Sequence, residues 1–138
     1  MMKRVLFICT HNSARSQMAE AFLRVFYGDH YEAYSAGTHP TEVNPYAIEV
    51  MMEIGIDISL HTSKSIEQFK GDNFDYVITV CDRAQETCPF FPRAQKLLHK
   101  SFTDPSQMSG PPDVVLAEFR HVRDEIKTWI EHTFDKEL

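Results

Sequence analysis

The sequence predicts an α/β fold, built as one three-layer domain over residues 1–138 with a four-stranded parallel sheet and helices on both faces. Strand-like apolar runs alternate along the chain with segments whose apolar residues recur at helical spacing, as in such sheets. Cys9, Cys81 and Asp104 lie at the ends of predicted strands, the edge where parallel sheets bind ligands. With 138 residues, 43% of them apolar, the chain can form one ordinary core.

The first elements are a strand, a helix and a second strand. The apolar run 5–8 predicts a short buried strand, and an amphipathic helix follows it. Gly28 suits a left-handed cap at the end of that helix, and residues 31–36 predict a second strand stopped by Gly37. One face of the helix is expected to carry Met18, Phe22, Val25 and Phe26.

The middle of the chain predicts a helix, an extended connector and a shorter helix. Asn44 is a good N-cap and Pro45 suits the first helical position, so a helix should start there and end near Gly55. Residues 65–69 predict the short helix. The connector between the two helices alternates apolar and polar residues, with Ile56, Ile58 and Leu60 as the apolar ones.

The C-terminal half predicts two more strands and the most regular helix. Residues 74–81 form a strand that runs into a cysteine, and at most one short helix fits before Pro89. A fourth strand is expected over residues 96–102. The last helix should bury one stripe, made of Val115, Phe119, Val122, Ile126 and Trp129. Its solvent face should carry Arg120, Arg123, Asp124, Glu125 and Lys127.

Composition limits the classes of partner and compartment. A net charge of −6 argues against binding to nucleic acid or to an anionic membrane surface. No stretch approaches the ~20 apolar residues of a membrane span, and the run at residues 5–8 is too short for a secretory signal. Three cysteines, an odd number, fit reactive thiols in a reducing compartment. We therefore expect a cytoplasmic protein, and we take a monomer as the expected state.

The loop between the first strand and the first helix predicts an oxyanion site with a nucleophile. Cys9 stands at the strand end and Arg15, five residues later, opens the helix, where amide N–H groups and a planar guanidinium can hold a tetrahedral anion. The same positive field, with a hydrogen bond from Ser16, favours the thiolate form of Cys9. Asn12 tolerates left-handed backbone. The expected anion-binding residues are Thr10, His11, Asn12, Ser13, Ala14, Arg15 and Ser16.

Cys81 and Cys88 predict a redox pair, with a structural cysteine in the core and an idle one in a loop as the alternative. Ends of a helix over residues 81–88 would lie about 10.5 Å apart, whereas a disulfide needs less than ~7 Å. A disulfide between them therefore requires that segment to unwind. Zinc is not expected, because CxxC spacing is absent, and no metal or cofactor is predicted.

Asp104, before Pro105, completes the candidate site. A carboxylate at a strand end near Cys9 can act as a general acid or base, although Asp before Pro is also common in simple turns. The histidines outside the loop after the first strand are not spaced as metal ligands would be.

These motifs resemble the arsenate reductases built on the low-molecular-weight phosphotyrosine phosphatase fold, especially the thioredoxin-coupled type. The loop alone would also suit a phosphatase, and the pair Cys81 and Cys88 distinguishes the reductases. The matching segments are residues 9–20, 34–37, 43–45, 55–59, 61–63, 80–81, 88–89, 103–105 and 119–126.

The resemblance implies a mechanism for each site residue. Cys9 would attack arsenate held by Arg15 and the loop amides, with phosphate or sulfate as competing anions, and Asp104 would assist the departing oxygen. Cys81 would then attack Cys9 and release arsenite, and Cys88 would attack Cys81. A thioredoxin-like partner would reduce the resulting disulfide.

Two positions depart from the family pattern. Ala14 stands where many relatives have another cysteine, which removes a competing thiol. Lys64 stands where some relatives place an acid that helps bind potassium, beside positions matching Asn12, Glu20 and Ser35. The Lys64 ammonium group can occupy that site itself.

Two other functions remain open from the sequence. A low-molecular-weight phosphotyrosine phosphatase would use Cys9, Arg15 and Asp104 without the other cysteines. After Asp-Pro those phosphatases usually carry aromatic residues, whereas Ser106 and Gln107 follow here. A non-enzymatic redox or oxyanion sensor would signal through a disulfide without multiple turnover.

Overall fold

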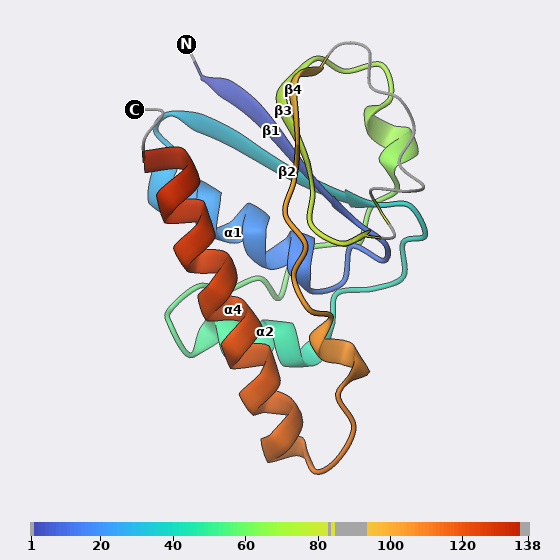
Figure 1. Ribbon diagram of the computed structural model, residues 1–138, viewed down its shortest axis with the longest axis vertical. Coiled ribbons are helices and arrows are strands. Elements are labelled where there is room, and N and C mark those ends of the chain that lie inside the picture. Colours follow the sequence, from blue (N-terminus) through green and yellow to red (C-terminus); the bar gives the residue numbers. More distant parts are fainter. Residues whose placement is uncertain (1, 83, 85–93, 136–138) are drawn as a thin grey trace.

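A four-stranded parallel sheet forms the centre of the computed structural model, which describes residues 2–82, 84 and 94–135 (Figure 1). The strand order is β2–β1–β3–β4. The strands are β1 (Lys3–Cys9), β2 (Tyr31–Gly37), β3 (Phe74–Thr79) and β4 (Ala94–His99). The predicted parallel α/β sheet is thereby confirmed.

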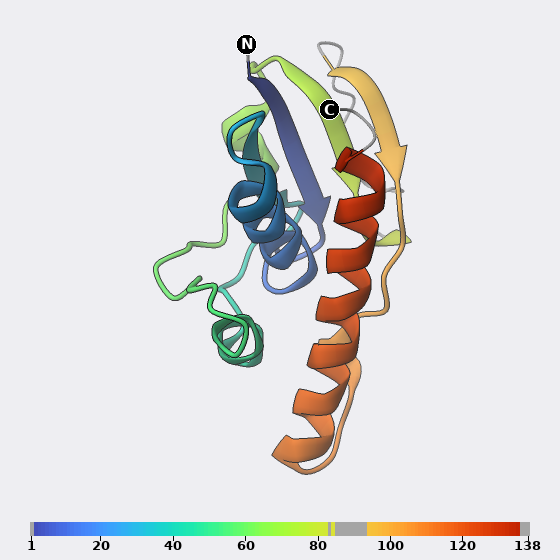
Figure 2. The ribbon, with the colours of Figure 1, turned by 90° about the vertical axis from the view of Figure 1, so that its left-hand side faces the viewer.

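Helices cover both faces of this sheet. The helices are α1 (Arg15–Tyr27), α2 (Pro45–Met52) and α4 (Pro112–Asp135), with 3₁₀ helices η1 (Ile66–Phe69) and η2 (Pro105–Gln107). α1 and α4 lie side by side against one face (Figures 1 and 2), where Phe134 packs edge-on against Phe7 of β1. η1 covers the other face. Its Phe69 packs on Tyr34, the register partner of Leu6, and Leu6 points to the face opposite to that of its neighbour Phe7.

The predicted caps and core stripes are mostly confirmed. Asn44 Oδ1 accepts from the amide of Tyr46 at the start of α2, and Ser65 caps η1 in the same way. Residues 5–8 of β1 are fully buried, and so are Phe119, Val122 and Ile126 of α4. No helix among the described residues is long and apolar enough to cross a membrane.

Several local predictions are wrong. Gly28 is right-handed (φ −61°), because the chain continues into a turn in which His30 N donates to Tyr27 O. On α1, Met18 and Phe22 are buried and Phe26 stacks on Phe22 as a shared face requires, but Val25 and Phe26 are themselves 55% and 41% exposed. Leu60 is 92% exposed at a turn, so the connector is not extended throughout.

The charged face of α4 also differs from the prediction. Arg123 is buried, and its Nη1 donates to Val50 O of α2 at 2.8 Å and to Glu53 Oε1 at 2.9 Å. A long side chain with a planar fork can reach across a helix pair, which periodicity alone does not reveal.

The third and fourth strands end earlier than predicted, but their pairing continues toward the site. β3 ends at Thr79, two residues before Cys81. β4 is shifted toward the N-terminus, and the amides of Lys100 and Phe102 still donate to the carbonyls of Thr79 and Val80. These bonds carry the chain past Cys81 and on to Asp104 at the carboxyl edge of the sheet.

Candidate active site

The loop after β1 folds tightly around Cys9. Asn12 adopts left-handed backbone (φ +50°), as predicted for this position. The loop packs so closely on β2 that a Cβ at Gly37 would lie 2.7 Å from Thr10 O and 2.8 Å from Asn12 N. Ala14 precedes α1 and offers no capping side chain, so the first amides of α1 are available to an anion.

Hydrogen bonds converge on the sulfur of Cys9. The amide of Asn12 donates to Sγ at 3.2 Å, and Ser16 Oγ lies 2.8 Å from it. Because Asn12 Nδ2 donates to Ser16 Oγ at 2.8 Å, the Ser16 hydroxyl proton is free to point at the sulfur. Two hydrogen-bond donors are therefore directed at the sulfur that the sequence predicts as the nucleophile.

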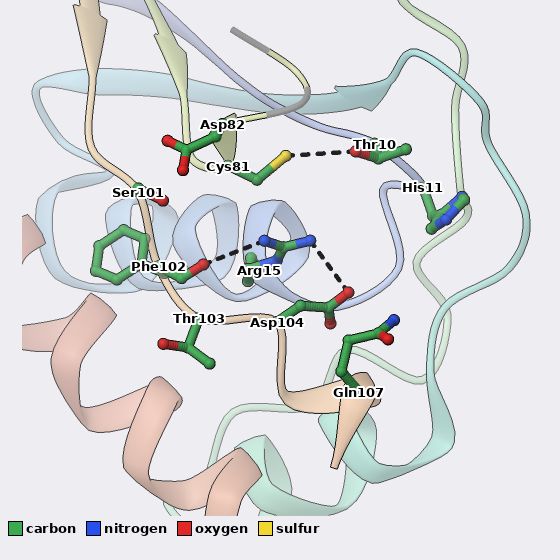
Figure 3. Close-up of a pocket in the computed structure, with 10 residues that line it drawn as sticks. All are labelled: Thr10, His11, Arg15, Cys81, Asp82, Ser101, Phe102, Thr103, Asp104 and Gln107. Carbon is green, nitrogen blue, oxygen red and sulfur yellow. Dashed lines mark hydrogen bonds and ion pairs between the residues drawn. The ribbon is translucent and has the colours of Figure 1, made fainter.

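Arg15 and Asp104 face each other across the site (Figure 3). Arg15 Nη2 lies 3.4 Å from Asp104 Oδ2, and Nη1 donates to Phe102 O at 3.1 Å. Burial raises the pKa of Asp104, but hydrogen bonds from Ser106 and the Arg15 charge outweigh it and hold the pKa below its ordinary range. The carboxyl group is therefore ionised next to Arg15.

Cys81, two residues after the end of β3, lies at the same site. Its Sγ is buried, lies 3.4 Å from Thr10 Oγ1, and accepts from the amide of Ala84 at 3.4 Å. It lines a cavity of about 480 Å³ together with Arg15 and Asp104 (Figure 3). A smaller cavity of about 120 Å³ lies over Cys9, and Arg15 and Asp104 line it too. Two thiols therefore share one arginine and one carboxylate.

Beneath the loop, Glu20 gathers polar partners. Ser35 Oγ donates to its carboxylate at 2.8 Å, and Arg24 Nη1 lies 3.2 Å from it. Lys64 Nζ lies 3.9 Å from Glu20 Oε1 and donates to Thr62 O at 2.8 Å. The ammonium group thus takes the place of a cation, and the residues present do not fit a potassium ion.

The polar side chains around Glu20 are continuous with a second group that holds the loop after β1. Asn12 Oδ1 accepts from Gln17 Nε2 at 3.0 Å and from the amide of Lys64 at 2.9 Å. His61 Nδ1 lies 3.1 Å from Gln17 Oε1, and burial lowers the pKa of His61. Within the described part of the chain, no three His, Cys, Asp or Glu side chains gather as metal ligands would.

The structure brings Cys9, Arg15, Cys81 and Asp104 to one site, whereas Cys88 lies outside the described residues. Sequence reasoning missed the contact of Thr10 with Cys81 and the part played by Ser106, whose amide and hydroxyl bond Asp104. The pattern Asp-Pro-Ser signals such a cap, because Asp side chains commonly accept from the amide two residues on.

Comparison with known proteins places the chain in a family. Residues 4–138 match the family described as low molecular weight phosphotyrosine protein phosphatase, so the chain belongs to that family.

Several relatives at 43–48% sequence identity are named arsenate reductases. One from Staphylococcus epidermidis is 48% identical over 129 residues, 94% of each chain. One from Bacillus subtilis is 43% identical and covers 90% of this chain and 89% of its own.

Solved structures lead to the same two groups. An arsenate reductase in a phosphate-binding state matches with a TM-score of 0.83 and 37% identity over 98% of both chains. A low molecular weight protein tyrosine phosphatase from T. tengcongensis matches with a TM-score of 0.78 and 29% identity over 99% of both.

Proposed function

We propose that this chain is an arsenate reductase, in which Cys9 forms the first bond to arsenate and Cys81 takes over the second step. The observation that carries the proposal is the position of Cys81: a second buried thiol, held by Thr10, in a cavity that Arg15 and Asp104 line. A phosphatase needs no such thiol. Relatives named arsenate reductase at 43–48% identity support the choice of substrate.

The first step is a displacement at arsenic. The Cys9 thiolate attacks arsenate held by Arg15 and the amides at the start of α1, a sulfur–arsenic bond forms, and one oxygen departs. Asp104 supplies the proton that lets this oxygen leave as water. When the substrate engages Arg15, Asp104 loses the charge that stabilises its carboxylate, so its pKa rises and protonation becomes easier.

The second step is the reduction itself. The Cys81 thiolate attacks Cys9 Sγ, a disulfide forms, and the sulfur–arsenic bond breaks. Its electron pair stays on arsenic, which leaves as arsenite, so two thiols supply the two electrons. In the proposal, Cys88 then attacks Cys81 and frees Cys9, and a thioredoxin-like dithiol reduces the Cys81–Cys88 disulfide.

The proposal also covers setting and assembly. Cys9 and Cys81 are both free thiols, and a reducing compartment such as the cytoplasm would keep them so between turnovers. We propose a cytoplasmic monomer in which residues 1–138 form a single domain.

A coupled assay tests this function. NADPH consumption is followed with thioredoxin and thioredoxin reductase, with and without arsenate, for the wild type and for Cys81→Ser and Cys88→Ser. Turnover should require arsenate and both cysteines, while hydrolysis of 4-nitrophenyl phosphate should survive in both variants. Arsenate reduction that continues without Cys81 would rule out the relay, and oxidation without arsenate would favour a sensor.

A further inference from the structure

A histidine and an aspartate are joined directly beside Cys81. His99 is the last residue of β4, and Asp82 follows Cys81 in the chain. His99 Nε2 lies 3.0 Å from Asp82 Oδ1, and His99 Nδ1 lies 2.7 Å from Thr79 Oγ1. Thr79 and His99 are register partners at the carboxyl ends of β3 and β4. Both ring nitrogens are thus anchored, one to the sheet and one to Asp82.

The hydrogen bonds fix which atom donates. A carboxylate only accepts, so His99 Nε2 carries the proton that it gives to Asp82. The hydroxyl of Thr79 donates to Nδ1 of a neutral ring. If the ring is charged, the hydroxyl accepts from Nδ1–H and turns its own proton toward Leu98 O, 3.5 Å away. The bond to Asp82 therefore survives in either state of the ring.

This pair restrains the residue that carries the second thiol. Before Cys81, the backbone of Val80 is tied on both sides, by its amide to Ile8 O and by its carbonyl to Phe102 N. After Cys81, Asp82 is held to the end of β4 by His99. Figure 3 shows the two side chains diverging: Sγ of Cys81 points to Thr10, and the carboxylate of Asp82 points away from it.

We propose that His99 is a positioning residue for the second step, because by holding Asp82 it keeps Cys81 Sγ aimed into the cavity that Arg15 lines. The inference rests on the proposed function. His99 exchanges no proton with the reacting atoms: Cys81 forms the bond to Cys9 Sγ, and the electron pair of the sulfur–arsenic bond stays on arsenic.

A role in stability alone is a weaker explanation. The Asp82 side chain is 74% exposed, and ion pairs of that kind contribute little to folding. Losing the pair should therefore leave the fold and the Cys9 loop intact while Cys81 samples more orientations. Misplaced reacting groups lower the rate of a step without lowering affinity for the substrate.

Three variants separate positioning from charge. Asp82→Ala and His99→Ala remove the hydrogen bond, whereas Asp82→Asn keeps an oxygen that accepts from His99 Nε2. His132→Ala, an exposed histidine of α4, is the matched control. Steady-state reduction of arsenate gives kcat and KM, and titration calorimetry with phosphate reports on the Cys9 loop. In a Cys88→Ser background, arsenate-dependent loss of two thiols per chain gives the rate of the second step directly.

Asp82→Ala and His99→Ala should lower kcat and the rate of thiol loss about fivefold, as expected for one side-chain hydrogen bond. KM, phosphate affinity and the unfolding midpoint should stay unchanged, and Asp82→Asn should restore most of the rate. Wild-type rates in both alanine variants, an equal loss of phosphate affinity, or no rescue by Asp82→Asn would overturn the positioning role. If the wild type itself loses no thiols with arsenate, the proposed function fails first.

Discussion

Asp104 is held in its ionised form by two neighbours. The amide and hydroxyl of Ser106 donate to Oδ1 at 3.0 and 2.7 Å, and Arg15 approaches Oδ2. An acid catalyst must nevertheless carry a proton, so these contacts set the pH at which Asp104 can act. Ser106 thus affects the pH range in which Asp104 can act as an acid.

Replacing Ser106 by alanine should shift the pH dependence of the first step. The variant loses the hydroxyl donor, so the pKa of Asp104 rises toward its ordinary value and the protonated acid persists to higher pH. The alkaline limb of kcat for 4-nitrophenyl phosphate hydrolysis, or for single-turnover formation of the arsenate adduct, should move upward. Ser109→Ala, in the turn before α4, is the control. A limb that stays in place would show that another group sets it.

Spacing and residue chemistry could predict Cys9, Arg15 and Asp104 as candidates, because each belongs to a short local pattern. The contact of Thr10 with Cys81 joins residues 71 apart in sequence, and the Asp82–His99 pair joins residues 17 apart. Such contacts depend on the order of strands in the sheet, which residue patterns leave open.

At the scale of elements, Glu53, which follows α2 directly, is the centre of the polar contact between α2 and α4. Arg120 binds its carboxylate through Nε and Nη2, and Arg123 adds Nη1 at 2.9 Å. The hydrogen bond from Arg120 is the largest influence on the pKa of Glu53; together with the Arg123 hydrogen bond and the two arginine charges it outweighs burial and holds that pKa below its ordinary value of 4.5. A lowered pKa means that the folded state prefers the ionised form.

Glu53→Gln should therefore destabilise the protein at neutral pH but not in strong acid. The stabilisation from ionised Glu53 is complete above pH 4.5 and is lost as the pH falls through the lower pKa of the folded state. Urea unfolding at neutral pH should show a lower midpoint for the variant, and the two proteins should converge in strong acid.

Glu67→Gln is the matched control, because its partner Lys70 lies 3.0 Å away on an exposed surface. Equal midpoints for wild type and Glu53→Gln at neutral pH would contradict the stabilising role of Glu53 between α2 and α4.

The order and type of elements could be read from periodicity and caps, but their edges could not. The frequency of left-handed glycine at helix ends predicts that conformation for Gly28, but the turn that follows sets its backbone. Periodicity predicts Arg123 on the solvent face because arginine is mostly exposed, but its acceptors, Val50 O and Glu53 Oε1, lie 73 and 70 residues away in sequence. Tertiary partners decided both positions.

For the molecule as a whole, the last turn of α4 covers the central strands of the sheet with one buried side chain. Phe134 is fully buried and packs edge-on against Phe7 of β1, Tyr31 of β2 and Tyr76 of β3. One side chain near the C-terminal end of the helix thus contacts three neighbouring strands. Two of these strands, β1 and β3, lead at their carboxyl ends to Cys9 and Cys81.

Phe134→Ala should cost about 3–5 kcal/mol in the free energy of unfolding, the usual loss for a buried Phe. Phe26→Ala, at a 41% exposed position of α1, should cost much less. Urea denaturation of both variants measures the difference. Similar losses would show that the ring cluster around Phe134 is not a main support of the sheet.

The Arg15–Asp104 pair also has a consequence for selectivity. In the empty site the guanidinium already faces an anion of the chain itself, so an incoming oxyanion must exchange with it. Asp104 acts here as a tethered competitor at high local concentration. A singly charged ion such as chloride can replace only the one negative charge that Asp104 already places beside Arg15. A doubly charged tetrahedral ion also accepts hydrogen bonds from the first amides of α1. Chloride should therefore bind poorly to the loop even at high concentration. Divalent tetrahedral oxyanions should bind to it much better.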